Sequence, residues 1–277
     1  MTTIVQPYFA MTDGVFDCMI DIERTEAFAR AIAATVRRGD VVVDMGTGSG
    51  VLALLAARVG AGKVYAVELD ANNIATLEVV FRANGLSKHI VLVQGDVRTV
   101  ELPEKVDVII GEMIATALID ELQVPAMNHM LRYAKPDARV LLSRYRTFAD
   151  LVDNPANYYG FEFPLVRYEY PDLRRLRSRA LTDKQLILDA DFTRPVTATR
   201  VDSRLSLTAQ RRGRVNGLRL SSETTFWDGS TLGATYAYSY PIILPVDPIE
   251  IAKGEVIEAR VGYTICGGMG TLKWAVG

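Results

Sequence analysis

Residues 41–70 constrain the fold of this chain more than any other segment. A β-branched run ends at Asp44 and is followed by three alternating glycines, Gly46, Gly48 and Gly50. A short apolar helical pattern and a second β-rich run come next. Glycine lets the backbone turn sharply and approach a ligand closely. A strand, a glycine turn, a helix and a second strand in this order predict a nucleotide site at the carboxyl edge of a parallel sheet.

The next acidic residue and the missing motifs narrow the kind of nucleotide. The second strand ends at Glu68, whose carboxylate can accept hydrogen bonds from ribose hydroxyls. Val51 occupies the position of the third glycine of G-x-G-x-x-G, so the dinucleotide fingerprint is broken. No Gly-Lys-Ser or Gly-Lys-Thr follows, which excludes a P-loop. An acid followed by G-x-G-x-G instead resembles motif I of the class I S-adenosylmethionine-dependent methyltransferases.

This resemblance implies that S-adenosyl-L-methionine is the cofactor, and it implies a role for each motif residue. Glu68 falls where the family places its ribose-binding acid. The three glycines, Gly46, Gly48 and Gly50, would surround the methionyl and ribose parts of the cofactor. Asp44 would orient the glycine loop rather than touch the substrate. The alternative is a glycine-rich turn that binds no ligand.

Strands and helices alternate as far as residue 146. The expected strands are 40–44, 63–68, 89–96, 105–112 and 138–143, and the expected helices are 17–37, 51–59, 72–83 and 119–134. This spacing predicts an α/β fold with a doubly wound, mostly parallel, Rossmann-like sheet. Residues 150–195 hold several prolines and are expected to be irregular. From residue 196 an alternating pattern with glycine-containing turns predicts an antiparallel β-barrel or β-sandwich. We therefore divide the chain into a cofactor-binding domain, 1–146, and a substrate domain, 147–277.

The composition argues against several classes of protein. A net charge of -2 over 277 residues gives no general attraction to nucleic acid. No apolar run approaches the ~20 residues needed to cross a bilayer, and the N-terminus lacks the pattern of a signal peptide. The two cysteines, Cys18 and Cys266, are far apart and form no C-x-x-C, so we expect reduced thiols and no zinc site. We expect a cytoplasmic protein without a membrane or nucleic-acid partner.

A second pattern, GEMIATALIDE, places Glu112 and Glu121 nine positions apart after the expected fourth strand. On one straight helix this spacing would put them on opposite faces, so they can meet only if the segment between them forms a loop. The pattern resembles the double-glutamate loop of the protein arginine methyltransferases, although the Ser, Trp, Gly and Tyr of that loop are absent. The resemblance implies that both glutamates bind the methyl acceptor. Taken alone, Glu121 could be a solvated carboxylate on a helix.

This second resemblance covers most of residues 8–146. The sequence MIDIERT matches the family's Met-Leu-x-Asp-x-x-Arg-Thr helix, which puts Arg24 where the family's arginine meets the carboxylate of the cofactor. Asp96, at the end of the expected third strand, would meet the adenine amine, and Val97 would add a backbone contact. The family tends to carry a glutamate where this chain has Arg98, so the adenine contact stays open between Asp96 and backbone groups.

The second half of the chain resembles the family's β-barrel more loosely. Both histidines lie in the first half, so the family's Thr-His-Trp loop has no histidine here and would fall near residues 236–238. We expect the alternating tyrosines of that segment to share one strand face and to pack in the core. The paired tyrosines of the family's N-terminal helix are reduced to Tyr8, with Phe9 beside it. The dimerisation arm, residues 160–188, is shortened, which leaves a homodimer open.

The chemistry follows from the two carboxylates. Together they can clamp a guanidinium, and one of them could instead act as a general base toward an amine. The sequence therefore predicts methyl transfer from S-adenosylmethionine to a guanidine or amine nitrogen, with Glu112 and Glu121 as catalytic residues. The substrate would be a small molecule or a peptide with a cationic nitrogen. The alternatives are methylation of another small metabolite or an RNA base, and a cofactor-binding protein without catalysis.

Overall fold

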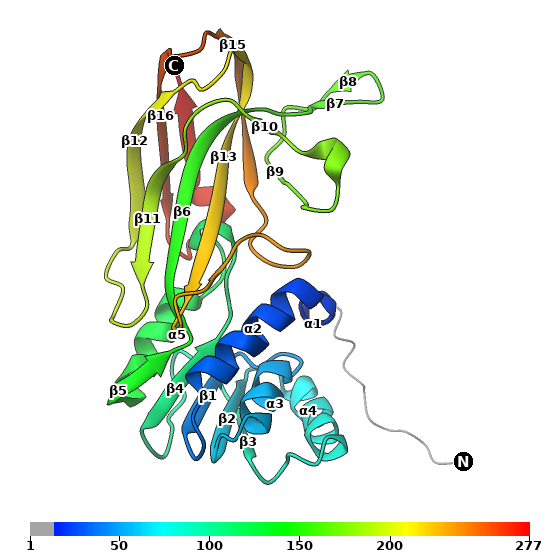
Figure 1. Cartoon of the computed structure of the whole chain (residues 1–277), viewed down its shortest axis with the longest axis vertical. Coiled ribbons are helices and arrows are strands. Elements are labelled where there is room, and N and C mark those ends of the chain that lie inside the picture. Colours follow the sequence, from blue (N-terminus) through cyan, green and yellow to red (C-terminus); the bar gives the residue numbers. More distant parts are fainter. Residues whose placement is uncertain (1–13) are drawn as a thin grey trace.

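The computed structural model describes residues 14–277, so Tyr8 and Phe9 lie outside the described residues. Figure 1 shows a long molecule, in which a parallel sheet and its helices form one end and long antiparallel strands form the other. Strand β6, Leu142–Asp153, begins almost directly after the last parallel strand and extends far into the antiparallel part. The two parts are therefore joined by a continuous strand.

Within the described residues, the parallel sheet has five strands in the order β3-β2-β1-β4-β5. The strands are β1 Val41–Met45, β2 Lys63–Glu68, β3 Ile90–Gln94, β4 Val106–Gly111 and β5 Ala134–Val140. All neighbouring pairs are parallel, which confirms the predicted sheet. The strand order reverses between β1 and β4. Sheets of this kind bind ligands at the carboxyl ends of the strands at such a reversal.

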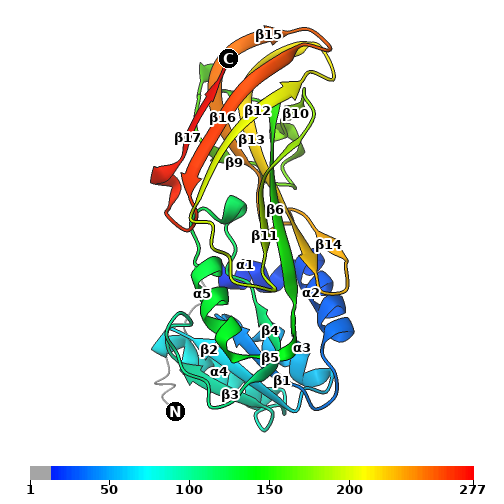
Figure 2. The same cartoon turned by 90° about the vertical axis from the view of Figure 1, so that its left-hand side faces the viewer.

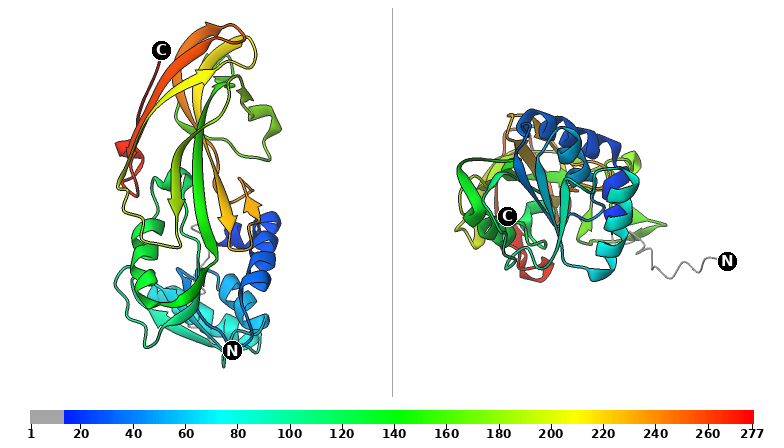
Figure 3. Two further views of the ribbon diagram at one scale, coloured as in Figure 1. Left: turned by 60° about the vertical axis from the view of Figure 1, so that its left-hand side comes forward. Right: turned by 90° about the horizontal axis from the view of Figure 1, so that it is seen from below.

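Helices cover both faces of this sheet, and its central strands are accordingly apolar and buried. The helices are α1 Val15–Ile20, α2 Ile22–Thr35, α3 Val51–Arg58, α4 Ala71–Ala83 and α5 Gln123–Met130. Seen from below, α2, α3 and α4 lie along one side of the sheet and α5 lies on the other (Figure 3). Helices α3 and α4 connect β1 to β2 and β2 to β3, and α5 connects β4 to β5, as the predicted βαβ units require.

Two expected helices are shorter in the structure. The helix expected over 17–37 is broken at Asp21, whose carboxylate accepts a hydrogen bond from the amide of Arg24 at 3.1 Å and so caps α2. The helix expected over 119–134 is reduced to α5 and the 3-10 turn η2, Leu131–Tyr133. Pro125 lies in the first turn of α5, where a missing amide costs no helical hydrogen bond.

The antiparallel part contains two larger sheets that face each other (Figure 2). One runs β10-β6-β13-β15-β9, with β11 added to β6 and β14 to β13, and the other runs β12-β16-β17. The bounds are β9 Arg167–Tyr168, β10 Arg179–Ala180, β11 Gln185–Asp191, β12 Arg200–Thr208, β13 Gly213–Phe226, β14 Thr231–Leu232, β15 Ile242–Ile251, β16 Val256–Thr264 and β17 Lys273–Val276. The predicted antiparallel architecture is confirmed. The expectation that residues 150–195 are irregular was wrong for the end of β6 and for β11.

An arm projects from the antiparallel part between β6 and β10 (Figure 1). It contains the hairpin of β7, Asn157–Tyr158, and β8, Phe161–Glu162, and the 3-10 turn η3, Arg174–Leu176. Its outer portion exposes the apolar side chains Tyr159, Phe161, Phe163, Leu165 and Val166. Another 3-10 turn, η4, Met269–Thr271, precedes β17. Among residues 14–277, no helix is long and apolar enough to cross a membrane.

Candidate active site

The loop after β1 requires its glycines for both conformation and space. Gly46, Gly48 and Gly50 have φ values of 61°, 54° and 77°, in the left-handed region that glycine tolerates best. A Cβ on Gly50 would lie 2.6 Å from the ring of Phe81 in α4. A Cβ on Gly46 would lie 3.1 Å from the sulfur of Met113, in the loop after β4. The glycine loop therefore lies directly beside the segment that carries the two glutamates.

Glu68, at the end of β2, holds the glycine loop from the side. Its carboxylate accepts hydrogen bonds from the amide of Gly48 at 3.1 Å and from the amide of Asp70 at 3.0 Å. Asn73 in α4 donates to Glu68 at 3.3 Å and to the carbonyl of Gly48 at 2.7 Å. A carboxylate offers about four acceptor sites, so Glu68 retains capacity for a further donor. The buried carbonyl oxygen of Asn73 has no partner, and this pair of acceptors fits a ligand with hydroxyl groups.

Asp44 lies under the glycine loop and is 1% exposed. Its carboxylate accepts a hydrogen bond from the hydroxyl of Thr47 at 2.6 Å. Burial raises the pKa of Asp44 to about 6, because the charged form loses its hydration, and the bond from Thr47 partly opposes the shift. This position orients the loop, and a role of Asp44 toward a ligand stays a prediction.

The carboxylate of Asp96 is occupied by a neighbouring arginine. Nε of Arg98 donates to the two carboxylate oxygens at 2.9 and 3.0 Å, and the amide of Arg98 donates to one of them at 2.9 Å. These bonds from Arg98 lower the pKa of Asp96 to about 2. Val97 is buried beside it. A ligand amine would have to share Asp96 with Arg98, so the adenine contact stays a prediction for both residues.

Arg24 of α2 and Glu112, directly after β4, form a buried ion pair whose side chains are 5% and 8% exposed. The other terminal nitrogen of Arg24 donates to the carbonyl of Cys18 at 3.1 Å, and the guanidinium lies 4.9 Å from the ring centre of Phe28. Burial opposes the charge on Arg24, but Glu112 outweighs this effect and raises the pKa. Nε of Arg24 is buried without a partner, so one donor remains for a further acceptor.

Residues 112–121 form an irregular loop with one short 3-10 turn, η1, Thr116–Leu118. Ala117 and Leu118 have positive φ values, which a regular right-handed helix excludes. The side chain of Gln123 is fully buried and closes the loop by accepting a hydrogen bond from the amide of Met113 at 2.9 Å. The two glutamates therefore do not lie on opposite faces of one helix.

Glu121 lies close enough to Glu112 for their charges to interact. Water reaches its side chain, but the surrounding protein and the carboxylates of Glu112 and Asp120 raise its pKa to about 7. Arg24 partly opposes this shift, and solvent screening limits it. Within residues 14–277, Glu121 takes part in no ion pair. The site thus combines one paired carboxylate with one that has no cationic partner.

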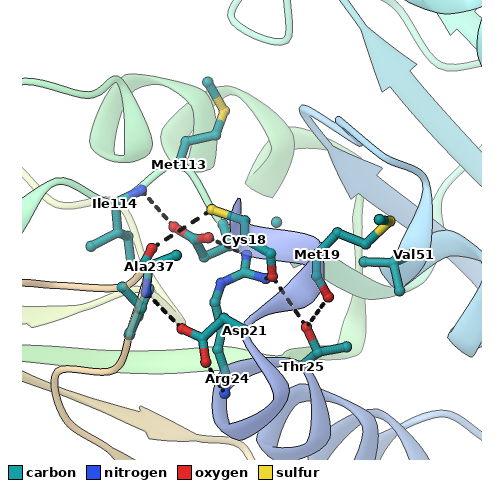
Figure 4. A network of polar contacts seen from close by, with 12 residues as sticks. Cys18, Met19, Asp21, Arg24, Thr25, Val51, Met113, Ile114 and Ala237 are labelled. Atoms are coloured by element: carbon teal, nitrogen blue, oxygen red, sulfur yellow. Dashed lines mark hydrogen bonds and ion pairs between the residues drawn. The ribbon is translucent and has the colours of Figure 1, made fainter. Parts of the chain in front are cut away.

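The barrel contributes the loop 233–241, between β14 and β15, to this site. The carboxylate of Asp21 accepts hydrogen bonds from the amide of Ala237 at 2.8 Å and from the hydroxyl of Thr235. The thiol of Cys18 lies 3.7 Å from the carbonyl of Ala237, and Figure 4 shows these groups around Arg24. Asp21 therefore fixes the barrel loop against the helix that supplies Arg24.

The expectation that Tyr236, Tyr238 and Tyr240 share a strand face was wrong. The segment forms a turn that is closed by a bridge between Thr235 and Tyr238. The three tyrosine side chains therefore do not point to one face, as they would in a regular strand. Tyr238 is buried near Arg24, whereas Tyr236 is 48% exposed.

Sequence reasoning overlooked three residues that shape the site. Asp21 was visible as a helix cap, because an Asp directly precedes the amphipathic run of α2. Asn73 stands near the start of α4 and gave no signal of its contact with the glycine loop. Gln123 gave no signal either, because its role depends on the path of the preceding loop.

Comparison with known proteins supplies the deciding observation. Residues 23–144 match the family model described as ribosomal protein L11 methyltransferase (PrmA). Over 150 residues the chain is 37% identical to probable protein arginine N-methyltransferase 6 of Arabidopsis thaliana. The chain is an S-adenosylmethionine-dependent methyltransferase. It resembles the protein arginine methyltransferases, as the sequence predicted.

The extent of these likenesses differs. The alignment with the Arabidopsis relative covers 52% of this methyltransferase and 34% of the relative. The uncharacterized protein MJ1452 of Methanocaldococcus jannaschii is 28% identical, over 95% of this chain and 96% of that protein. The fold matches the Trypanosoma brucei PRMT1 enzyme-prozyme complex with a TM-score of 0.74 at 19% identity, over 95% of this chain and 96% of that one. The methyltransferase thus spans about a third of the Arabidopsis relative but nearly all of the archaeal one.

Proposed function

We propose that this methyltransferase transfers a methyl group from S-adenosylmethionine to a nitrogen of a guanidinium group, on an arginine of a peptide or on a small molecule. The observation that carries the proposal is the irregular loop after β4. It leaves Glu112 and Glu121 close enough to interact, and it places Met113 against the glycine loop. Both acids would then lie next to the methyl group of a cofactor in that loop.

The electrostatics of the pair support a cationic acceptor. Two carboxylates that share a site repel each other, which is one cause of the raised pKa of Glu121. A guanidinium would relieve this repulsion and could donate to both acids through its planar set of N–H groups. Holding the acceptor nitrogen in line with the methyl–sulfur bond would supply much of the rate acceleration.

We assign the cofactor to the groups around the glycine loop. The backbone of Gly46, Gly48 and Gly50 would surround it, and Glu68 would bind the ribose hydroxyls with the remaining acceptor capacity described above. The unpaired Nε of Arg24 would meet the cofactor carboxylate. Asp44 would keep the loop in place, and Asp96 and Val97 would border the adenine.

One observation favours a second acceptor, a protonated amine. A general base works best when its pKa lies near the operating pH, and the pKa of Glu121 is about 7. Glu121 could therefore remove the proton that an ammonium group must lose before methylation. A guanidinium binds in its charged form to both acids. As the N–CH3 bond forms and the S–CH3 bond breaks, the methylated nitrogen must also release one proton, which Glu121 could accept.

Methyl transfer to matched peptides tests the proposal. Labelled S-adenosylmethionine would be supplied with peptides that carry arginine, lysine or the neutral isostere citrulline at one position. We expect transfer to arginine, none to citrulline, and loss of transfer in Glu112→Gln and Glu121→Gln. Cofactor affinity should be retained in Glu121→Gln, which leaves the ion pair of Arg24 with Glu112 intact. Glu258→Gln, an exposed glutamate on β16, is the matched control. Transfer to lysine alone would identify the amine as the acceptor, and full activity in both site variants would refute the proposal.

The organisation of the chain is proposed on other observations. We keep the division into a cofactor domain, 1–146, and a substrate domain, 147–277, which meet within β6.

The exposed apolar side chains of the outer arm suit a homodimer, because such patches often mark interfaces. Sedimentation of a Phe161→Ser variant as a monomer, with the unchanged protein dimeric, would support it. The unpaired thiols Cys18 and Cys266 suit a cytoplasmic location.

A further inference from the structure

Three tyrosines pack together at one side of the candidate active site. The ring centre of Tyr240 lies 4.9 Å from that of Tyr170 and 5.8 Å from that of Tyr168. The ring planes of Tyr170 and Tyr240 cross at 62°, an edge-to-face arrangement, and those of Tyr168 and Tyr240 are tilted at 57°, so neither pair is stacked. Such pairs leave part of the ring faces uncovered. We call Tyr168, Tyr170 and Tyr240 the tyrosine cluster.

Backbone contacts place the tyrosine cluster beside the two glutamates. Thr116, within the loop that carries Glu112 and Glu121, donates a hydrogen bond to the carbonyl of Tyr240. Tyr168 pairs with Ile242, so β9 runs alongside the start of β15. In the view of Figure 1, the segment after β9 lies above the loop 233–241, and this loop lies above α1. The tyrosine cluster thus lies beside the loop that carries Glu112 and Glu121.

The tyrosine cluster is partly open to solvent, and acids without an ion-pair partner lie near Tyr168 and Tyr240. One cation is also close, because Arg177 donates hydrogen bonds to the carbonyl of Pro171, next to Tyr170. Tyr170 is 46% exposed, and Asp17, Asp120 and Glu121 are exposed acids. None of these three acids forms an ion pair within residues 14–277. Burial, followed by Asp120, Tyr170 and Glu121, raises the pKa of Tyr168, which indicates that the two acids lie near its ring.

We propose that the tyrosine cluster binds a second cationic side chain of the substrate, distinct from the guanidinium held by Glu112 and Glu121. The inference rests on the proposed function and deepens it, because it selects a peptide with two nearby basic residues over a small molecule with one. A cation placed over an aromatic face is attracted by the ring, and nearby carboxylates add to this attraction. The apolar stem of an arginine or lysine can pack along the rings at the same time.

Tyr170 is the best position for a test. The hydroxyl of Tyr240 supports the loop through the carbonyl of Tyr236, and Tyr168 belongs to a strand, so changes there would alter more than the ring. Binding would be measured by calorimetry on the full chain loaded with S-adenosylhomocysteine. The probes are a peptide with two arginines separated by two glycines and the same peptide with citrulline as the second residue.

We expect Tyr170→Leu to weaken binding of the two-arginine peptide by about 2- to 30-fold, the range of a lost cation–π contact. The citrulline peptide should bind the variant and the unchanged protein equally. Tyr170→Phe keeps the ring and should retain the affinity. Trp227→Leu, at an aromatic residue of similar exposure (44%), is the control and should change neither peptide.

Three results would overturn the tyrosine cluster as a cation site. They are equal weakening for both peptides, equal weakening in the Leu and Phe variants, and a two-arginine peptide that binds the unchanged protein no better than the citrulline peptide. Methyl transfer is measured separately on the same peptides. Binding with the predicted preference but without methyl transfer would refute the proposed reaction and leave this site standing, whereas transfer without the preference would do the reverse.

Discussion

The guanidinium of Arg24 and the carboxylate of Glu112 join helix α2 to the end of strand β4 through a nearly fully buried contact. The proposed function gives Arg24 to the cofactor and Glu112 to the methyl acceptor. Their ion pair therefore connects the two ligand sites directly. If the cofactor draws Arg24 away from Glu112, the carboxylate is left without its partner and can bind the cationic acceptor more strongly. We therefore expect binding of cofactor and acceptor to be coupled.

Arg24→Met should destabilise the fold as well as weaken cofactor binding. The substitution leaves Glu112 buried without its cation, and breaking a buried ion pair in this way costs about 3–5 kcal/mol. The free energy of unfolding, measured by urea denaturation at neutral pH, should fall by this order. The double variant Arg24→Met/Glu112→Gln should recover part of the loss, since no buried charge is then left unpaired. A single variant as stable as the unchanged protein would contradict the prediction.

Glu68→Ala should weaken binding of S-adenosylhomocysteine by about 1.5–3 kcal/mol, the value of hydrogen bonds to a charged group. The substitution also removes the acceptor for the amide of Gly48, so the glycine loop loses a support. Calorimetry measures the change. Glu104→Ala is the control, because Glu104 accepts hydrogen bonds from Lys63 and Tyr65 away from the glycine loop. An unchanged dissociation constant in Glu68→Ala would remove Glu68 from the cofactor site.

The raised pKa of Glu121 predicts a dependence of stability on pH. The folded state binds the proton of this group more tightly than the unfolded state, in which the pKa is near 4.5. The contribution of Glu121 to stability is therefore full below the unfolded pKa and is lost as the pH rises toward the folded value of about 7. Denaturation should show Glu121→Gln to be more stable than the unchanged protein at pH 8 but not at pH 4. The same difference at both pH values would contradict this assignment.

Gly50→Ala should destabilise the protein more than Gly85→Ala. Both glycines have positive φ, which costs an alanine about 1–2 kcal/mol. Only Gly50 also lacks space, since its Cβ would meet Phe81 at 2.6 Å while a Cβ on Gly85 would meet no atom within 4 Å. Overpacking adds about 1–3 kcal/mol. Thermal denaturation of both variants separates the conformational cost from the steric one, and equal losses would show that α4 gives way.

The parallel half could be predicted from the sequence because its information is local. The valine runs, the glycine turn and Glu68 follow one another within thirty positions, and a buried parallel strand has a clear apolar signature. β6 was harder to find because several consecutive residues, Ala149–Val152, are buried, which removes the alternation expected of a half-exposed strand. Residues 150–195 were expected to be irregular because this part of the sequence does not alternate between apolar and polar residues.

The candidate site was predictable only in part, for a related reason. The family resemblance predicted roles for Arg24, Glu112 and Glu121, but it gave no sign that Arg24 pairs with Glu112 across 88 positions. The turn that carries Tyr236, Tyr238 and Tyr240 was predicted as a strand, because tyrosines at every second position are also typical of a strand. Its true shape depends on Asp21, which binds the loop from 216 positions away. Contacts over such distances are set by the tertiary fold, which short patterns do not record.

The junction between β5 and β6 limits how this molecule can move. A single residue, Leu141, separates the two strands. Its amide donates to the carbonyl of Ile109 in the parallel sheet, and its carbonyl accepts from the amide of Trp227, the residue directly after β13. Such a connection offers no hinge about which the two parts could rotate. We therefore expect substrate to enter and leave through rearrangement of peripheral segments, such as α1 and the arm, while the distance between the two parts stays fixed.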